Sequence, residues 1–181
     1  MRTLPPLALA AALAGTLLLT ACDDDGAGAD DVKNADRPAT SACALGDMGV
    51  QIGAGAAPAA GDTGTVTVTL TNKGAQCTLK GFPGVDLMAD DSTTSVSPDE
   101  GVKAQPLTLG KGGTTSFTIT YLRGETGSPK SLPVRKASFT LPGATEDAHT
   151  LTWSYGEVAR RDGGPGGAAQ ASVSGFESSG D

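Results

Sequence analysis

The sequence predicts an all-β domain, an antiparallel β-sandwich of immunoglobulin-like type with seven to eight short strands. Apolar and polar residues alternate with a period of two in several segments, and glycines and prolines separate these segments. No window between residues 42 and 158 shows a convincing apolar repeat of 3.6 residues, which a helix would need. A small closed barrel is the alternative architecture.

The clearest predicted strand covers residues 65–71. It places Val66, Val68 and Leu70 on one face and threonines on the other, as in a half-buried strand. Residues 72–74, Asn-Lys-Gly, then supply the chemistry of a turn.

Further strands are predicted from the same alternation. The stronger segments are 115–121, 137–141 and 151–155, and the weaker ones are 50–52, 85–88 and 107–109. In the segment 151–155, Trp153 alternates with Leu151 and Tyr155. We therefore expect Trp153 to pack in the core rather than to serve as an exposed platform for a sugar ring.

The composition divides the chain into four parts. Residues 1–21 are a predicted signal peptide, 22–41 a disordered acidic tether, 42–158 the β-sandwich domain and 159–181 a flexible Gly-rich tail. The tether carries aspartates among Gly and Ala and has almost no large apolar side chain to bury. The tail contains Gly163-Gly164-Pro165-Gly166-Gly167, followed by small residues, which we expect not to pack.

The N-terminal apolar run ends in Leu19-Thr20-Ala21-Cys22. It is too short for a comfortable membrane span and has the small residues that a signal peptidase needs. The motif resembles the lipobox of bacterial lipoproteins, which implies a diacylglycerol on the Cys22 sulfur. Two acyl chains would anchor the protein stably to the outer face of the cell membrane, in an extracytoplasmic location. The alternative is an ordinary secretory signal cut near Ala21.

With Cys22 assigned to the lipid, Cys43 and Cys77 remain as a pair. In an oxidising compartment a disulfide is the default for such a pair. A metal site is the alternative, and it is disfavoured because no Cys-x-x-Cys spacing occurs and His149 is the only histidine.

The charge balance excludes one class of partner. The chain has 13 Lys and Arg against 20 Asp and Glu, a net charge of −7, without a basic cluster. Nucleic-acid binding needs Lys and Arg at the phosphates, so we expect no nucleic-acid partner.

A stretch around the second of the paired cysteines carries a family resemblance. Residues 77–85, Cys-Thr-Leu-Lys-Gly-Phe-Pro-Gly-Val, follow the motif 68–74, Val-Thr-Leu-Thr-Asn-Lys-Gly. Together with Cys43 and residues 107–117 they resemble a family of actinobacterial secreted lipoproteins built on a domain of unknown function. The resemblance covers about residues 42–156 and implies a β-sandwich with a Cys43–Cys77 disulfide, but no activity. Lys111 stands where that family often has proline.

The same motif also has a physical interpretation. Gly81 and Gly84 flank Phe82 and Pro83, which indicates a tight bend. We expect Phe82 to be buried beneath this bend. The alternative is an exposed aromatic loop that binds a ligand.

No catalytic site and no cofactor are predicted. His149 lies in a predicted polar turn without a nucleophile elbow, so we expect it to be solvated. The carboxylates at 90–91 and 99–100 are expected in exposed turns. A copper site would have to use Met48, Met88 and His149, the available soft and borderline ligands.

These observations favour a non-enzymatic binding or interaction module at the cell envelope. Its expected partners are the membrane, through the lipid, and an unknown envelope protein or glycan, contacted through loops at one end of the sandwich. The alternative is an envelope protein that handles copper or a small molecule, and less favoured still is a hydrolase.

Overall fold

The computed structural model describes residues 41–178 apart from residues 145–146, 163 and 165. The predicted signal peptide, Cys22 and the tether up to residue 40 lie outside the described residues. The described residues belong to a compact unit that begins at Pro38. They contain no helix long and apolar enough to cross a membrane.

The larger of the two main sheets is built around two long strands, β2 (Thr63–Asn72) and β8 (Thr114–Leu122). They pair antiparallel from Thr63 opposite Leu122 to Thr71 opposite Thr114. The strand order is β1-β2-β8-β13-β6, and β14 also pairs with β8. The shorter strands are β1 (Met48–Ile52), β6 (Ser97–Pro98), β13 (Ala171–Val173) and β14 (Glu177–Ser178).

The second main sheet has the order β11-β10-β4-β5. Its strands are β4 (Gly84–Ala89), β5 (Ser92–Ser95), β10 (Lys136–Thr140) and β11 (Ala148–Thr152). Two small sheets join β3 (Cys77–Leu79) to β7 (Leu107–Leu109) and β9 (Ser131–Leu132) to β12 (Val158–Ala159). One short 3-10 helix, η1 (Leu45–Asp47), precedes β1.

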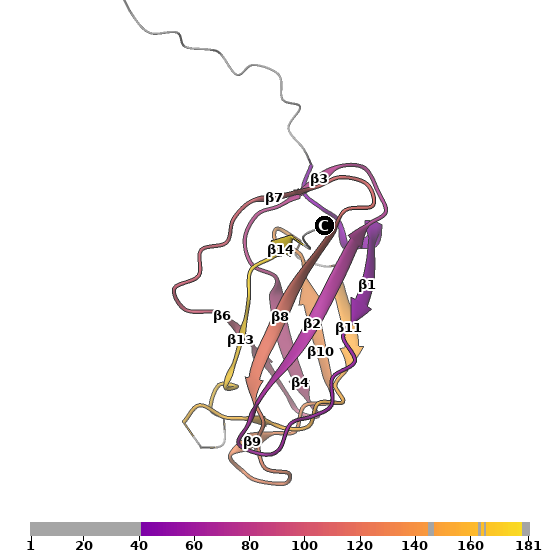
Figure 1. Cartoon of the computed structure of the whole chain (residues 1–181). Coiled ribbons are helices and arrows are strands. Elements are labelled where there is room, and N and C mark those ends of the chain that lie inside the picture. The colour runs from indigo at the N-terminus through magenta and orange to yellow at the C-terminus, as the bar shows by residue number, and fades with distance from the viewer. Residues whose placement is uncertain (1–40, 145–146, 163, 165, 179–181) are drawn as a thin grey trace, which may run out of the picture. The chain divides into compact units, whose positions relative to one another are not determined.

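The core lies between the two main sheets. In Figure 1, β2 and β8 cross in front of β4 and β10, and the rings of Phe117 in β8 and Phe139 in β10 meet edge to face with centroids 5.2 Å apart. Val66, Val68 and Leu70 are fully buried, so the predicted inward face of β2 is confirmed. The fold is therefore mostly β, with two layers of antiparallel strands.

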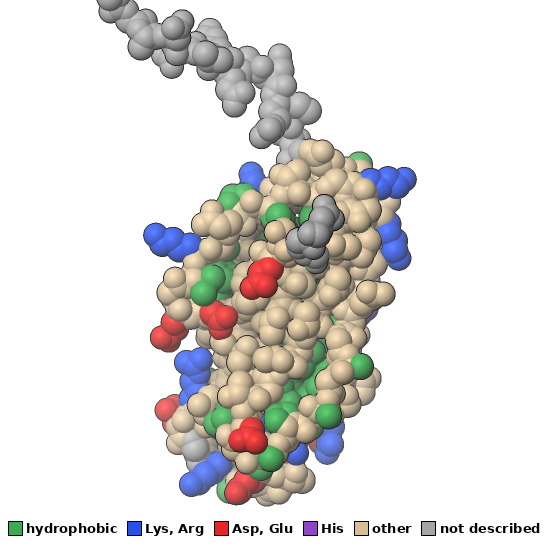
Figure 2. All heavy atoms as spheres, in the orientation of Figure 1, with side chains coloured by type: hydrophobic (Ala, Val, Ile, Leu, Met, Phe, Trp, Pro, Cys, Tyr) green, Lys and Arg blue, Asp and Glu red, His purple; other side chains and the backbone are tan. Residues whose placement is uncertain are grey.

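The outward face of β2 and β8 carries hydroxyl side chains. Thr67 lies opposite Thr118, and their Oγ1 atoms are 3.5 Å apart. Figure 2 shows an uncharged surface over the middle of these strands. The predicted threonine face is thus a solvent-facing sheet surface. Its members are Thr65, Thr67, Thr69 and Thr71 of β2 and Thr114, Ser116, Thr118 and Thr120 of β8.

The prediction of a flexible tail over 159–181 is wrong for the described residues. β13 pairs with β8, and Ala169, Ala171 and Val173 are buried. Phe176 packs edge to face against Phe117, with ring centroids 5.8 Å apart. Small residues are sufficient here because β8 supplies a preformed edge for backbone hydrogen bonds. The domain therefore does not end at residue 158 but continues to Ser178.

The strand predictions differ from the structure in three further respects. The additional strands are short pairings of two to four residues, which have too few residues to show an alternation. One pair, β13 with β6, is parallel. The segment 151–155 is not one strand: β11 ends at Thr152, and Trp153 and Tyr155 follow it as buried residues. An immunoglobulin-like topology stays a prediction.

The tight bend predicted around Phe82 is present, but the predicted full burial of Phe82 is not. Gly81 has a φ of +120°, which few other residues adopt, and Pro83 is buried. Phe82 itself is only half-buried, so it is neither a fully buried side chain nor a free aromatic loop.

Candidate binding site

The predicted disulfide is confirmed. Cys43 and Cys77 are joined, with their Cα atoms 4.9 Å apart, and the bond ties the first described segment to β3. Backbone hydrogen bonds reinforce the link, because Thr78 N–H donates to Ser41 and Cys43 N–H donates to Thr78. We name this part of the domain, with Cys43, Asn72 and Cys77, the disulfide end.

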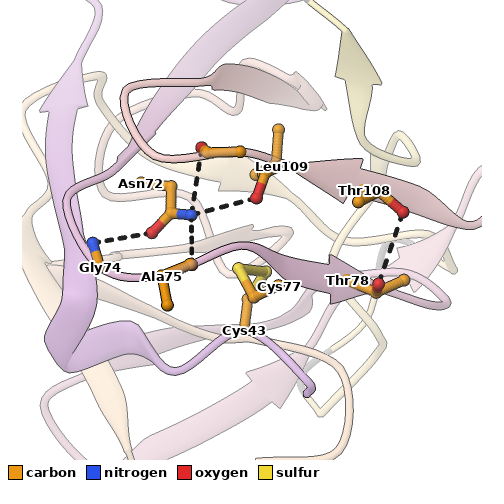
Figure 3. Close-up of a disulfide and its surroundings, with 9 residues drawn as sticks. Cys43, Asn72, Gly74, Ala75, Cys77, Thr78, Thr108 and Leu109 are labelled. Atoms are coloured by element: carbon orange, nitrogen blue, oxygen red, sulfur yellow. Dashed lines mark hydrogen bonds between the residues drawn. A yellow bond between two sulfur atoms is a disulfide. The ribbon is translucent and has the colours of Figure 1, made fainter. Parts of the chain in front are cut away.

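Asn72 organises the disulfide end (Figure 3). Its side chain is buried and its Nδ2 lies 2.8 Å from the Ala75 carbonyl oxygen and 3.1 Å from that of Leu109. A third carbonyl oxygen, of Gly110, lies 3.2 Å away, and Oδ1 accepts a hydrogen bond from Gly74 N–H. The end of β2 is thereby held to the turn after β7, with both polar atoms of the amide satisfied. This is a structural arrangement, not an open site.

The candidate copper ligands are not brought together. Met48 belongs to β1 of the larger sheet, whereas Met88 and His149 belong to the second sheet. Along β10, Met88 pairs with Lys136 and His149 with Phe139, so they lie at different levels. Within the described residues no group of three or more His, Cys, Asp or Glu side chains could hold a metal ion.

His149 does not lie in the turn that the sequence predicts. It is the second residue of β11, half-buried, and its ring packs against Phe139 with centroids 5.3 Å apart. Its imidazole is a packing group in this position.

The two acidic loops lie apart. Asp90 and Asp91 form the exposed turn between β4 and β5, and Asp90 lies 3.8 Å from the guanidinium of Arg135. Asp99 and Glu100 follow β6, where Asp99 N–H donates to Val173. The structure therefore does not combine them into one acidic surface.

The opposite end of the domain contains the chain's two tyrosines and its one tryptophan. Trp153 lies edge to face between Tyr121 and Tyr155, with ring centroids 5.1 Å and 5.0 Å apart, and all three are buried. The predicted core position of Trp153 is confirmed. We name this region, together with Arg123 and Gly156, the aromatic end; it lies near β9 in Figure 1.

The hydroxyl groups of Tyr121 and Tyr155 and the indole N–H of Trp153 each donate a hydrogen bond to a backbone carbonyl. Tyr121 O–H donates to the Tyr155 carbonyl at 2.8 Å, and Tyr155 O–H donates to Gly53 at 2.9 Å. Trp153 Nε1–H donates to the Gly156 carbonyl at 2.6 Å. Burial raises the pKa of Tyr121, while the positive charge of Arg123 lowers it in part. The phenol is therefore held neutral well into the alkaline range.

Arg123 follows directly after β8 and forms no ion pair with a carboxylate of the described residues. Its Nη1 donates to the carbonyls of Gly124 and Glu157, and its Nη2 lies 3.4 Å from Thr126 Oγ1. Its Nε is buried without a hydrogen-bond partner among the described residues. The one ion pair in the described part of the chain is that between Arg135 and Asp90. Arg123 is thus a half-buried cation that makes no ion pair with any described residue, although the Glu157 and Glu125 carboxylates line the same two surface hollows as Arg123.

Gly156 makes room for this guanidinium. It has a φ of +80°, and a Cβ built on it would overlap Arg123 Nε and Cζ. A side chain at position 156 would therefore be strained in its backbone and would also displace Arg123.

Two open hollows share Arg123 as a wall. One has a volume of about 280 Å³, and its walls include Pro133, Val134, Arg135, Trp153 and Glu157. The other has a volume of about 340 Å³ and includes Glu125, Ser128 and Lys130. Chemically, the pair offers guanidinium and ammonium donors, the carboxylates of Glu125 and Glu157, and apolar walls.

Sequence reasoning missed this site. Arg123 is separated from Arg135 by twelve positions and from Gly156 by more than thirty in the sequence. One signal was available: an arginine comes two residues after the last inward-facing residue of a strong strand, Tyr121.

The sequence profile of one family, described as a Domain of unknown function (DUF4232), matches residues 43–177. The chain belongs to this family. The DUF4232 match begins at Cys43 and reaches Glu177 in β14, so it includes the C-terminal strands that the sequence assigned to a tail. No curated protein and no solved structure matches the chain significantly.

Proposed function

We propose that this DUF4232 chain is a lipid-anchored, non-enzymatic binding module on the outer face of the cell membrane. The observation that carries the proposal is Leu19-Thr20-Ala21-Cys22 at the end of an apolar N-terminal run. Acylation of Cys22 would supply two acyl chains, enough for stable anchoring. The Cys43–Cys77 disulfide supports an oxidising, extracytoplasmic location.

The proposed contact surface is the aromatic end. Arg123 lies there without an ion pair in the described part of the chain, beside two hollows. The rings of Tyr121, Trp153 and Tyr155 give this surface a rigid base, because each is buried and hydrogen-bonded to backbone. Binding surfaces are commonly built from loops held by such a scaffold. An immunoglobulin-like form of the two-layered fold is part of this proposal.

Anchoring is tested with the variant Cys22→Ser and with Asp25→Asn, which keeps the cysteine. After fractionation of expressing cells, the unchanged chain and the Asp25 variant are expected in the membrane fraction. The Cys22 variant is expected in the medium, because it lacks the acylated sulfur. Retention of the Cys22 variant in membranes after a detergent partition would contradict the lipid anchor.

Binding is tested by capture from an envelope extract on the immobilised full chain, with an Arg135→Gln chain beside it. A partner retained by the unchanged chain and depleted on the variant supports contact at the aromatic end. Equal retention on both chains would place the contact elsewhere on the domain. Turnover of an envelope substrate by the purified chain would contradict the non-enzymatic assignment.

A further inference from the structure

We propose that the aromatic end binds a single oxyanion group, a carboxylate or a phosphate, seated between Arg123 and Arg135. The inference rests on the proposed function and deepens it, because it states which chemical group of the partner the module recognises. The ligand would enter the hollow of about 280 Å³ that both guanidiniums help to line.

The first argument is the uncompensated charge of Arg123. Charged groups taken out of water are normally paired, because removing their hydration is costly. Arg123 is half-buried and donates to two carbonyls and a hydroxyl, yet it has no ion pair in the described part of the chain, and its Nε is unpartnered. An external anion in the hollow would bring a negative charge to the guanidinium, while the buried Nε itself stays out of its reach.

The second argument is that the neighbouring carboxylates form no ion pair with Arg123 among the described residues, and that Asp90 holds Arg135 only weakly. Glu157 lines the hollow, but its Oε1 accepts a hydrogen bond from Gly127 N–H at 3.0 Å. The Asp90–Arg135 pair is 3.8 Å apart, with the side chains 69% and 67% exposed. Pairs as exposed as this one contribute little, so a ligand can displace Asp90 at small cost.

The third argument is the shape and chemistry of the wall. A guanidinium presents a planar fork of donors that matches the two oxygens of a carboxylate or phosphate. Pro133, Val134 and Trp153 line the same hollow and offer apolar surface to the body that carries the anion. A sugar acid has such a body with a carboxylate, and a glycerol phosphate has one with a phosphate.

The experiment is a titration of the ¹⁵N-labelled full chain, purified in detergent, followed through amide resonances. The probes are sodium glucuronate and sodium glycerol phosphate, with sodium chloride at equal ionic strength as the control. Saturable shifts of Gly124, Gly127 and Gly156 amides with at least one oxyanion, and none with chloride, are expected. The stronger of the two responses identifies the carboxylate or the phosphate source. Absence of saturation with both oxyanions would overturn the proposal.

Three exposed or isosteric variants make the test specific. Arg135→Gln should weaken binding about tenfold, as expected for loss of a charged hydrogen-bond donor. Lys136→Gln removes the same charge from the next residue, which does not line the hollow, and should change the affinity less than twofold. Glu157→Gln keeps an oxygen for Gly127 N–H but removes a repelling charge, and should tighten binding about threefold.

The directions of the three affinity changes distinguish a specific binding site from a general effect of net charge. Equal weakening by Arg135→Gln and Lys136→Gln would overturn the proposal, because only net charge would matter. Since the titration uses purified chain, it fails or succeeds regardless of anchoring. A chain that is membrane-anchored and captures a partner, yet binds no oxyanion, would retain the proposed function and lose this inference alone.

Discussion

The two ends of this domain differ in how one polar side chain at each end, Asn72 or Arg123, is hydrogen-bonded. At the disulfide end, the Asn72 amide is 1% exposed and both its oxygen and its nitrogen are hydrogen-bonded. At the aromatic end, Arg123 is half-buried, carries a full charge, and leaves Nε without a partner. A satisfied network rigidifies a fold, whereas a buried polar group without a partner costs stability. The difference separates an end that holds segments of the domain together from the end at which we propose binding.

The largest expected effect concerns the disulfide. Replacing both cysteines, Cys43→Ala with Cys77→Ala, removes a crosslink over a sequence separation of 34 residues. The free energy of unfolding should fall by about 3–4 kcal/mol, measured by urea denaturation of the full chain. Oxyanion binding at the aromatic end should persist in conditions where the variant is folded. A loss of stability below about 1 kcal/mol would contradict the structural role given to this end.

The second effect concerns Asn72. Asn72→Ala leaves Gly74 N–H and the carbonyls of Ala75 and Leu109 without the partner they have now. The expected loss is about 3 kcal/mol in the same denaturation experiment, because several buried groups lose a hydrogen bond together. Gln51→Ala, an exposed polar residue of the same sheet, is the control and should change the stability by less than about 0.5 kcal/mol. A similar loss of stability in both variants would mean that the hydrogen bonds of Asn72 contribute no more to stability than an exposed polar side chain does.

A third variant examines the contact between Gly156 and Arg123. Gly156→Ala should cost about 2 kcal/mol, because it combines a strained φ of +80° with overlap of the guanidinium. Gly101→Ala is matched in φ, +79°, but has open space around its Cβ, so it should cost about 1 kcal/mol. Thermal unfolding of both variants gives the difference. Equal losses of stability in the two variants would show that the Arg123 guanidinium can move away from position 156 at no cost in free energy.

The smallest effect concerns Tyr121. Tyr121→Phe removes the hydrogen bond to the Tyr155 carbonyl and should cost about 1 kcal/mol at neutral pH. Burial raises the pKa of Tyr121 in the folded protein, so the neutral phenol contributes stability that is fully present below the ordinary pKa of about 10. That contribution is lost as the pH rises through the folded-state pKa. Urea denaturation from pH 7 to 11 should therefore show a steeper alkaline decline for the unchanged chain than for the variant; parallel curves would argue against a buried phenol.

Much of the fold could be predicted because its signal is local. Val66, Val68 and Leu70 show their inward face within one strand, and Trp153 shows its core position beside Leu151 and Tyr155. The disulfide was predictable because two cysteines remain once Cys22 is set aside. Residues 168–178 were not predictable in this way, because their few small side chains show no strong pattern. They become strands through hydrogen bonds to β8, which lies far away in the sequence.

The candidate site was even less predictable from local sequence pattern than the C-terminal strands. Its charge and its apolar wall come from Arg123, Arg135 and Trp153, on three separate segments. Sequence spacing does not show that these residues are close together, because their proximity depends on the ends of β8 and β11 meeting the start of β10.

The sequence by itself determined the all-β class, the main strands and their buried faces, and the pair of cysteines. These properties follow from side-chain period and residue type, which act over a few neighbours in the chain. Only the tertiary structure decided that the C-terminal segment completes the larger sheet and that Arg123 lies over Gly156 without a carboxylate. Both depend on groups brought together from distant parts of the chain, where burial and the loss of water set the energy of each polar group.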